Sequence, residues 1–400
     1  MLHARDVAHM AEGATPALLA VSRLTMTDFR NYASQRLETT AAVPVVLTGP
    51  NGAGKTNVLE ALSYLTAGRG LRGARLGELA RIGGAGGWSV AAEVETQTGR
   101  VSIGTGIEGR TAASTDSDED GVDRRQVRID GASARGPAAL ADVLRAIWLT
   151  PQMDGLFIQG RSERRRFLDR LVLGYDPEHG RRVGGFERAM RDRAKLLRDG
   201  TGDDAWLAAL EARMAEASVA IAAARRETVG RLHAALAQGL GPFPKAGLAL
   251  EGFAEELLEA HAALEVETRL QDQLRTNRPA DASSGRTRDG AHRTDLLVTH
   301  LDNGMPAGLC STGEQKALLV AVVLADARLQ AAYRGAPPVL LLDEIVAHLD
   351  GGRRAALFDE ILALGAQTWL TGTDRALFEP LDRMAQFAMV EHGKVTGLDG

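Results

Sequence analysis

The sequence predicts an α/β protein that is interrupted by a long helical segment, and three observations support this fold class. A glycine-rich loop lies between an apolar strand and a helix at residues 43–65. A second apolar strand, at residues 338–344, ends in two acidic residues. Between them, residues 155–285 are rich in arginine and carry apolar side chains at helical spacing, which predicts a helical insertion.

Composition restricts the classes of protein that fit. The chain has 400 residues, of which 44% are hydrophobic and 25% charged, as expected for a soluble globular protein without membrane contact. The net charge of −5 means that any nucleic-acid site must be a local basic patch. The single cysteine, Cys310, excludes an internal disulfide and a cysteine-based zinc site, and is typical of proteins in the cytoplasm.

Short β-like runs dominate the first part of the chain, at residues 18–26, 43–47, 88–94, 101–107, 126–129 and 147–149. Residues 1–17 lack an apolar core and are predicted to form a disordered extension, not a signal peptide. The acidic run at residues 114–123 is predicted to be a solvated hairpin loop.

The glycine-rich loop has the G-x-x-x-x-G-K-[ST] pattern in the strand–loop–helix context that the pattern requires. Its glycines allow backbone N–H groups to surround a polyphosphate at a helix N-terminus. Lys55 is expected to reach the terminal phosphates, and Thr56 to coordinate Mg²⁺. The sequence therefore predicts an ATP site formed by Gly49, Pro50, Asn51, Gly52, Ala53, Gly54, Lys55 and Thr56.

The apolar strand at residues 338–344 ends in Asp343 and Glu344. At the carboxyl end of a strand beside a phosphate loop, Asp343 would bind Mg²⁺ and Glu344 would deprotonate the attacking water. A strand followed by acidic residues often occurs by chance. The presence of a phosphate loop in the same chain makes this strand a strong indication of a nucleotide site.

Residues 310–316, Cys-Ser-Thr-Gly-Glu-Gln-Lys, open an apolar helix and have two interpretations. Ser311 and Glu314 match the S-x-x-E capping box, which needs no ligand. A helix N-terminus with Ser311 and Gly313 is equally an anion site.

The inserted segment carries a heptad seam formed by Leu207, Leu210, Met214, Ala217, Ile221 and Ala224. Leu257, Leu264 and Leu270 are expected to supply a facing surface, and residues 277–287 a loop that returns the chain to the first domain. Basic residues gather at two places, and either phosphate contact with DNA or pairing with neighbouring acids would account for them. These residues are Arg161, Arg164, Arg165, Arg166, Arg170, Arg188, Arg191, Arg193, Lys195 and Arg198.

The phosphate loop, the Ser-Thr-Gly-Glu-Gln helix start and the Asp343–Glu344 strand, in this order, resemble the ATP-binding-cassette (ABC) ATPases. Residues 347–350, Ala-His-Leu-Asp, resemble the D-loop of that superfamily. Residues 371–374, Thr-Gly-Thr-Asp, lie where the superfamily usually has a switch histidine, so the γ-phosphate sensor near Thr373 differs here. Gln152 matches the Q-loop, which implies a further Mg²⁺ ligand.

Within this superfamily the chain resembles the RecF family of bacterial recombination mediators over residues 19–391. The resemblance rests on Asp-Phe-Arg-Asn-Tyr at residues 28–32, Arg-Arg-Arg-Phe-Leu-Asp at 164–169, Gly-Ala-His-Arg-Thr-Asp-Leu at 290–296, and the helix start at 310–319. Two features depart from the family pattern: the acidic insertion at 114–123, and Gln152 where many relatives carry an acid.

The resemblance implies a Rad50-like ATPase head formed by residues 18–154 and 286–400, with residues 155–285 as an inserted helical arm. It implies that Asn31 joins the nucleotide site, and that Ser311, Gly313 and Glu314 bind ATP held by a second copy in an ATP-dependent homodimer. It further implies binding to single-stranded, duplex or junction DNA at single-strand gaps and slow, DNA-dependent ATP hydrolysis that works as a switch. With RecO and RecR, such a protein would promote RecA loading in repair, replication restart and SOS induction.

Three other classes fit less well. An ABC transporter ATPase would have its signature closer to the phosphate loop and would lack the insertion at 155–285. An SMC or Rad50 tether needs a longer coiled coil, and a zinc hook needs more cysteines than Cys310. A small-molecule kinase would leave the Ser311 helix start without a purpose.

Overall fold

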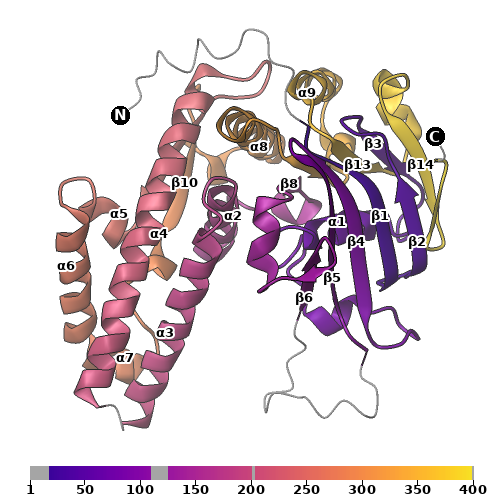
Figure 1. Cartoon of the computed structure of the whole chain (residues 1–400). Helices are drawn as coiled ribbons and strands as arrows, with labels where there is room; N and C mark the ends of the chain where they lie inside the picture. Colours follow the sequence, from indigo (N-terminus) through magenta and orange to yellow (C-terminus); the bar gives the residue numbers. More distant parts are fainter. Residues whose placement is uncertain (1–17, 110–124, 201–202, 399–400) are drawn as a thin grey trace.

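The computed structural model describes residues 18–109, 125–200 and 203–398, so the predicted extension at 1–17 and the acidic run at 114–123 lie outside it. Figure 1 shows two lobes, one containing the two large sheets and one dominated by long helices. We call these lobes the head and the arm. No helix of the described ranges is long and apolar enough to cross a membrane.

The first sheet of the head is antiparallel and has the strand order β2-β1-β4-β5-β6-β7. Its central strands alternate buried and exposed side chains, as expected for a sheet with one face on a core. The strands are β1 (Ala20–Phe29), β2 (Tyr32–Glu38), β4 (Trp88–Thr96), β5 (Gly99–Ile107), β6 (Gln126–Ile129) and β7 (Ala132–Ser133).

The second sheet has the order β15-β14-β3-β13-β12-β8 and is parallel except for β15. This sheet combines segments from both ends of the chain: β3, from the N-terminal part, lies between β13 and β14, from the C-terminal part. The strands are β3 (Val45–Thr48), β8 (Ala146–Leu149), β12 (Val339–Leu342), β13 (Thr368–Gly372), β14 (Gln386–Glu391) and β15 (Lys394–Thr396).

Alternate residues of β3 and β13 enter two different cores, which explains why these central strands are buried on both faces. Val46 and Leu370 pack in the core that contains α8 (Thr312–Arg334) and α9 (Gly351–Leu364). Val45 and Trp369 pack in the core shared with α1 (Lys55–Tyr64) and the first sheet. Helix α1 is thereby held between the two sheets, with the phosphate loop at its start.

The arm is built around α4, which packs against α3 and α6. The predicted seam on α4 is largely confirmed, since Leu207, Leu210, Met214 and Ile221 are buried. Of the facing residues, Leu270 is buried but Leu264 is 75% exposed, so Leu264 was predicted wrongly. The helices are α2 (Arg161–Leu173), α3 (His179–Asp199), α4 (Asp204–Gln238), α5 (Phe253–Leu257), α6 (Ala263–Thr276) and α7 (Arg278–Ser284).

Two segments differ from the sequence expectations. Residues 246–251, inside the segment predicted to be helical, form the strand β9 (Ala246–Glu251). It pairs with β10 (Asp295–His300), which pairs in turn with β11 (Met305–Pro306). The expected loop at 277–287 contains α7. The pairing of β9 with β10 crosses the predicted boundary at residue 285, because β9 lies in the predicted arm and β10 in the predicted head. The domain boundaries at 155 and 285 therefore remain a prediction.

Short 3₁₀ turns connect several of these elements. They are η1 (Leu76–Leu79), η2 (Pro137–Asp142), η3 (Pro151–Met153), η4 (Ala291–Arg293), η5 (Ala307–Leu309), η6 (Ile345–His348) and η7 (Arg375–Leu381).

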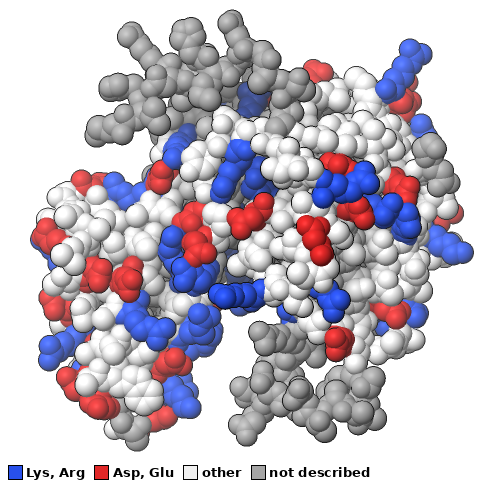
Figure 2. Space-filling view, in the orientation of Figure 1, with Lys and Arg blue, Asp and Glu red and all other residues white. Residues whose placement is uncertain are grey.

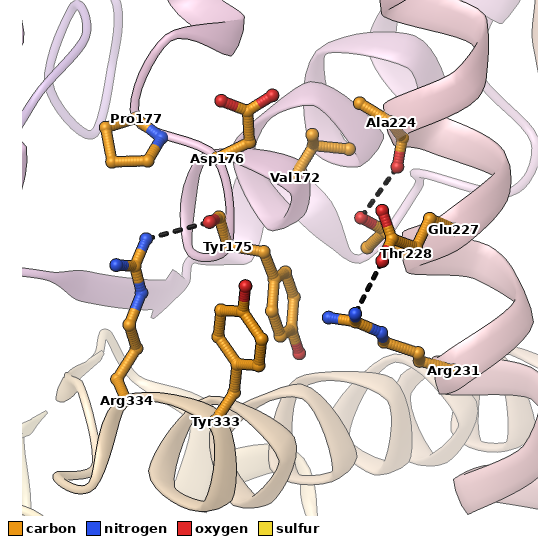
Figure 3. Close-up of a pocket in the computed structure, with 10 residues that line it drawn as sticks. All are labelled: Val172, Tyr175, Asp176, Pro177, Ala224, Glu227, Thr228, Arg231, Tyr333 and Arg334. Carbon is orange, nitrogen blue, oxygen red and sulfur yellow. Dashed lines mark hydrogen bonds and ion pairs between the residues drawn. The ribbon is translucent and has the colours of Figure 1, made fainter. Parts of the chain in front are cut away.

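The arm and the head meet at the C-terminal end of α8, beside a pocket of about 290 Å³. Figure 3 shows Tyr175 and Tyr333 side by side in this pocket, and Arg334 hydrogen-bonded to the backbone oxygen of Tyr175 at 2.8 Å. The Tyr175 hydroxyl also donates to Asp326 Oδ1 on α8 at 2.8 Å. Helix α8 therefore runs from its N-cap Ser311 to the joint with the arm.

Candidate functional site

The phosphate loop runs from β3 into α1, and two of its positions accept only glycine. A Cβ on Gly49 (φ 144°) would lie 2.2 Å from the backbone oxygen of Val390. A Cβ on Gly54 (φ 117°) would lie 2.5 Å from Asn31 Nδ2. Both φ values lie where other residues are rare, so the loop combines the required backbone shape with close packing.

Lys55 is folded into this loop. The residue is 4% exposed, and its Nζ donates to the backbone oxygens of Gly49 at 2.8 Å and Pro50 at 3.0 Å. Burial lowers the pKa of Lys55, while the nearby carboxylates of Glu344 and Asp343 act to raise it. The ammonium is therefore positioned where a polyphosphate inside the loop would meet it.

Thr56 and Asp343 are brought together from positions 287 residues apart. The Thr56 hydroxyl lies 2.9 Å and 3.0 Å from the two carboxylate oxygens of Asp343. The Thr371 hydroxyl donates to Asp343 Oδ1 at 2.7 Å and accepts from the backbone N–H of Glu344 at 2.9 Å. Glu344 adopts φ 51°, a left-handed conformation that is uncommon for a non-glycine residue and clusters at functional sites.

The donor set around Asp343 fits Mg²⁺. Asp343 is 5% exposed, and within the described residues no Lys, Arg or His forms an ion pair with it. No group of three or more His, Cys, Asp or Glu in those residues could form a complete metal cage. One carboxylate and one hydroxyl, completed by phosphate oxygens and water, is a usual Mg²⁺ environment.

Asn31 lies beside the phosphate loop and supports it. Its Nδ2 donates to the Ala53 oxygen at 2.9 Å, and its Oδ1 accepts from Asn57 Nδ2 at 2.8 Å. The neighbouring Tyr32 hydroxyl donates to the Gly54 oxygen at 3.1 Å. These contacts brace residues 53–54, and binding of nucleotide by Asn31 stays a prediction.

The sequence did not predict a role for Glu60, a buried carboxylate in the middle of α1. Glu60 is fully buried and forms two 2.8 Å bonds with Arg30 and one of 2.9 Å with Arg72. Arg72 also donates to Asn57 Oδ1 at 2.9 Å. Arg30 belongs to the Asp-Phe-Arg-Asn-Tyr motif, so the sequence indicates that this arginine matters. The motif does not indicate that its partner is Glu60.

Ser311, Gly313 and Glu314 lie at the start of α8, where the capping box is formed. Ser311 Oγ accepts from the Glu314 N–H at 3.3 Å, and the Ser311 N–H donates to Glu314 Oε2 at 2.8 Å. The hydrogen bonds to Ser311 hold the pKa of Glu314 below its usual range. Ser311 and Gly313 are exposed, and no hydrogen bond of the described residues joins them to the phosphate loop. An additional role for them in a second copy stays a prediction.

Gln152 is exposed in η3, and the described residues include no hydrogen bond between its side chain and Asp343 or Thr56. The residues on either side of Gln152 in the chain, Trp148 and Asp154, nevertheless contact α2 and α8. Asp154 Oδ2 lies 3.1 Å from Lys316 Nζ on α8, and the Arg170 guanidinium on α2 lies 4.4 Å from the ring centroid of Trp148. Metal binding by Gln152 stays a prediction.

Several of the predicted basic residues form ion pairs with acidic side chains of the same chain. Arg164 binds both oxygens of Asp295 at 2.8 Å, so two of the sequence motifs contact each other. Arg193 is fully buried between Glu211 and Asp281. The exposed members of the set are Arg161, Arg166, Arg188, Arg191, Lys195 and Arg198. Figure 2 shows Lys and Arg side chains along the hollow between the arm and the head.

Residues 20–396 match the RecF/RecN/SMC N terminal domain family. The chain is also 51% identical to the DNA replication and repair protein RecF of Mesorhizobium japonicum over 383 residues, covering 95% of this chain and 98% of that one. The chain belongs to the RecF family. RecF of Rhizobium etli strain CIAT 652 is 50% identical, with 96% of this chain and 100% of the relative covered.

Solved structures extend this result to the fold. A structure of the recombination mediator protein RecF-ATPrS in the RecFOR pathway superposes with a TM-score of 0.81 at 20% identity, covering 96% of this chain and 99% of that chain. An Smc head bound to the C-winged helix domain of ScpA gives 0.53 at 16% identity, with 94% and 97% covered. The predicted α/β ABC-type ATPase head and the predicted RecF family are confirmed.

Proposed function

We propose that this RecF-family chain is an ATP-dependent DNA-binding recombination mediator in DNA replication and repair. The contact between Thr56 and Asp343 carries the proposal, because it joins a phosphate loop to a metal-binding carboxylate in one site. In this proposal the protein closes as a homodimer on ATP and binds DNA at single-strand gaps. Together with RecO and RecR it promotes RecA loading, and so serves replication restart and SOS induction.

Each part of the nucleotide site has a distinct task in this proposal. The Lys55 ammonium leaves the Gly49 and Pro50 oxygens and binds the terminal phosphates, which stabilises the charge that develops there. Thr56 and Asp343 would hold Mg²⁺, which would neutralise phosphate charge when bound. Glu344 orients the attacking water and accepts its proton.

The site is incomplete within one copy. Lys55, Thr56, Asp343 and Glu344 lie together, whereas Ser311 is exposed and caps its own helix. A second copy that places its Ser311, Gly313 and Glu314 against the γ-phosphate would complete the site, and ATP would then join the two copies. Hydrolysis would reopen this dimer, so that a weak ATPase activity acts as a switch and not as a metabolic reaction.

Three variants at two positions separate ATP binding from hydrolysis. Lys55→Ala removes the ammonium and is expected to abolish ATP binding, while Lys55→Arg impairs hydrolysis because a planar guanidinium replaces a point charge. Glu344→Gln keeps the shape of the site and removes the base, so ATP is expected to close a dimer that persists. Light scattering at micromolar protein with ATP measures this. Monomers only in Glu344→Gln, or unchanged ATP-dependent DNA association in Lys55→Ala, would overturn the proposal.

A further inference from the structure

A second pocket, of about 500 Å³, opens where the arm, β10 and α9 converge. Its walls come from three separate segments: the loop after α4, the residues that end β10, and the first turn of α9. In Figure 1 the end of α4 from which this loop continues is the end nearest α8 and α9. The polar side chains that line it are Gln238, Lys245, His300, Asp302 and Arg353.

His300 lies in this pocket with an unsatisfied ring. Its side chain is 10% exposed, and Nδ1 is buried with no hydrogen-bond partner in the described residues. The nearest carboxylate oxygen, Oδ2 of Asp302, is 3.9 Å away, which is too far for a hydrogen bond. A buried polar group without a partner is destabilising, and its presence at a pocket marks a place where a ligand is able to bind.

The lining of the pocket carries two side-chain cations and one carboxylate, before the Asp350 carboxylate beside Arg353 is counted. Lys245 is exposed and forms no ion pair with the described residues, and Arg353 reaches only Asp350 at 3.7 Å. Against these cations the pocket contains one carboxylate, Asp302, whose side chain is 57% exposed. The fields of His300 and Arg353 also act to lower the pKa of Glu314, so the pocket lies close to the start of α8.

We propose that this pocket binds a phosphate group of the DNA backbone through Lys245, His300 and Arg353. This inference rests on the proposed function and gives it a specific DNA contact. Two side-chain cations and an imidazole suit an anion, and the volume leaves room for the adjoining sugars. The loop at residues 239–244, Gly-Leu-Gly-Pro-Phe-Pro, offers few side chains that would read bases, so the contact is independent of DNA sequence.

A nucleotide bound by a second copy is the other source of phosphate, because the pocket lies near Glu314. The two sources are distinguished by removing the charges and measuring DNA binding and dimerisation separately. The test variant is Lys245→Gln with Arg353→Gln in the full chain. The matched control is Arg36→Gln with Arg128→Gln, which removes the same charge from exposed positions on the first sheet.

Affinity for gapped DNA is measured by fluorescence anisotropy with ATP at several salt concentrations. The test variant is expected to bind about 10-fold more weakly near 0.1 M salt. The slope of its log affinity against log salt should become shallower by about 0.9 for each phosphate that it no longer binds. The control keeps the wild-type slope, and ATP-dependent dimerisation without DNA is unchanged in both variants.

Other results would overturn the inference. A loss of DNA-free dimerisation with an unchanged salt slope would assign the pocket to the nucleotide of a second copy. A slope equal to that of the control would show that the pocket binds no phosphate. Absence of DNA binding by the wild-type chain would instead contradict the proposed function itself. If the double variant unfolds, Lys245→Gln is compared with Arg36→Gln alone, because each removes one charge from an exposed position.

Discussion

The hydroxyl of Thr371 lies between the two acids that follow β12. It donates to Asp343 Oδ1 at 2.7 Å and accepts from the Glu344 N–H at 2.9 Å. Thr371 is itself fully buried on β13. A single side chain from the neighbouring strand thus fixes both the carboxylate proposed to bind Mg²⁺ and the backbone of the proposed base.

Thr371→Val keeps the shape of the side chain and removes both hydrogen bonds. We expect about 1–3 kcal/mol lower stability, because the part-buried Glu344 N–H loses its partner and Asp343 Oδ1 keeps the Thr56 hydroxyl but loses that of Thr371. ATP hydrolysis is expected to fall at least about 10-fold, since the proposed base is less well oriented. Thr371→Ser, which keeps the hydroxyl, is the control. Equal turnover in the Val and Ser variants under saturating ATP would contradict the role of Thr371.

Ser311 is tested by two substitutions that separate capping from binding in a second copy. Ser311→Ala is expected to cost about 1 kcal/mol as a lost N-cap. Ser311→Arg places a bulky cation where the γ-phosphate of the partner should lie, so this variant should bind ATP yet fail to dimerise. Mixing it with Lys55→Ala should restore part of the ATPase activity, because one composite site is then intact. Normal dimerisation of Ser311→Arg alone, without such rescue, would reduce Ser311 to a helix cap.

The sequence predicts the head better than the arm, for physical reasons. The phosphate loop and the strand before Asp343 are local patterns, and their geometry follows from residues close in the chain. The partners of Arg193 lie 18 and 88 residues away, so no local pattern distinguishes it from the exposed Arg191. β9 is likewise stabilised by pairing with β10, more than 40 residues later. The role of Thr371 depends on the neighbouring strand in the same way.

Arg193 is predicted to stabilise the arm and not to contact DNA. Arg193→Met leaves Asp281 and part of Glu211 buried without their cation, which is expected to cost about 3–5 kcal/mol. Arg191→Met, at an exposed neighbouring position, should change stability by less than about 0.5 kcal/mol. Urea denaturation measures both. Unchanged stability of Arg193→Met, with weaker DNA binding, would place this residue on the DNA surface instead.

Asp326 gives stability an unusual pH dependence. Burial raises its pKa to about 7, against the hydrogen bonds from Tyr175 and Gln330 and the charge of Arg170. Between about pH 4 and pH 7 the native state therefore holds a proton that the unfolded state has released, so stability falls as pH rises and levels off above pH 7. Asp326→Asn is expected to flatten this slope between pH 5 and pH 8.

Urea denaturation at pH 5, 6, 7 and 8 checks this expectation, with the exposed Asp359→Asn as control. The amide that Asp326→Asn introduces would mimic the protonated acid. After a rotation of the Gln330 side-chain amide, the new NH₂ group would donate to the buried Gln330 Oε1, which now has no hydrogen-bond partner among the described residues. Parallel pH profiles for wild type and Asp326→Asn would show that the carboxyl is ionised throughout.

The position of β3 between β13 and β14 has a consequence for how the protein is made. During synthesis the phosphate loop emerges early, but both neighbours of its strand follow more than 300 residues later. Until then β3 has unpaired edges on both sides, while the arm, whose helices contact one another within a continuous segment, is free to fold first. A nascent chain that stops before residue 368 would therefore expose β3 to aggregation and be unable to bind nucleotide.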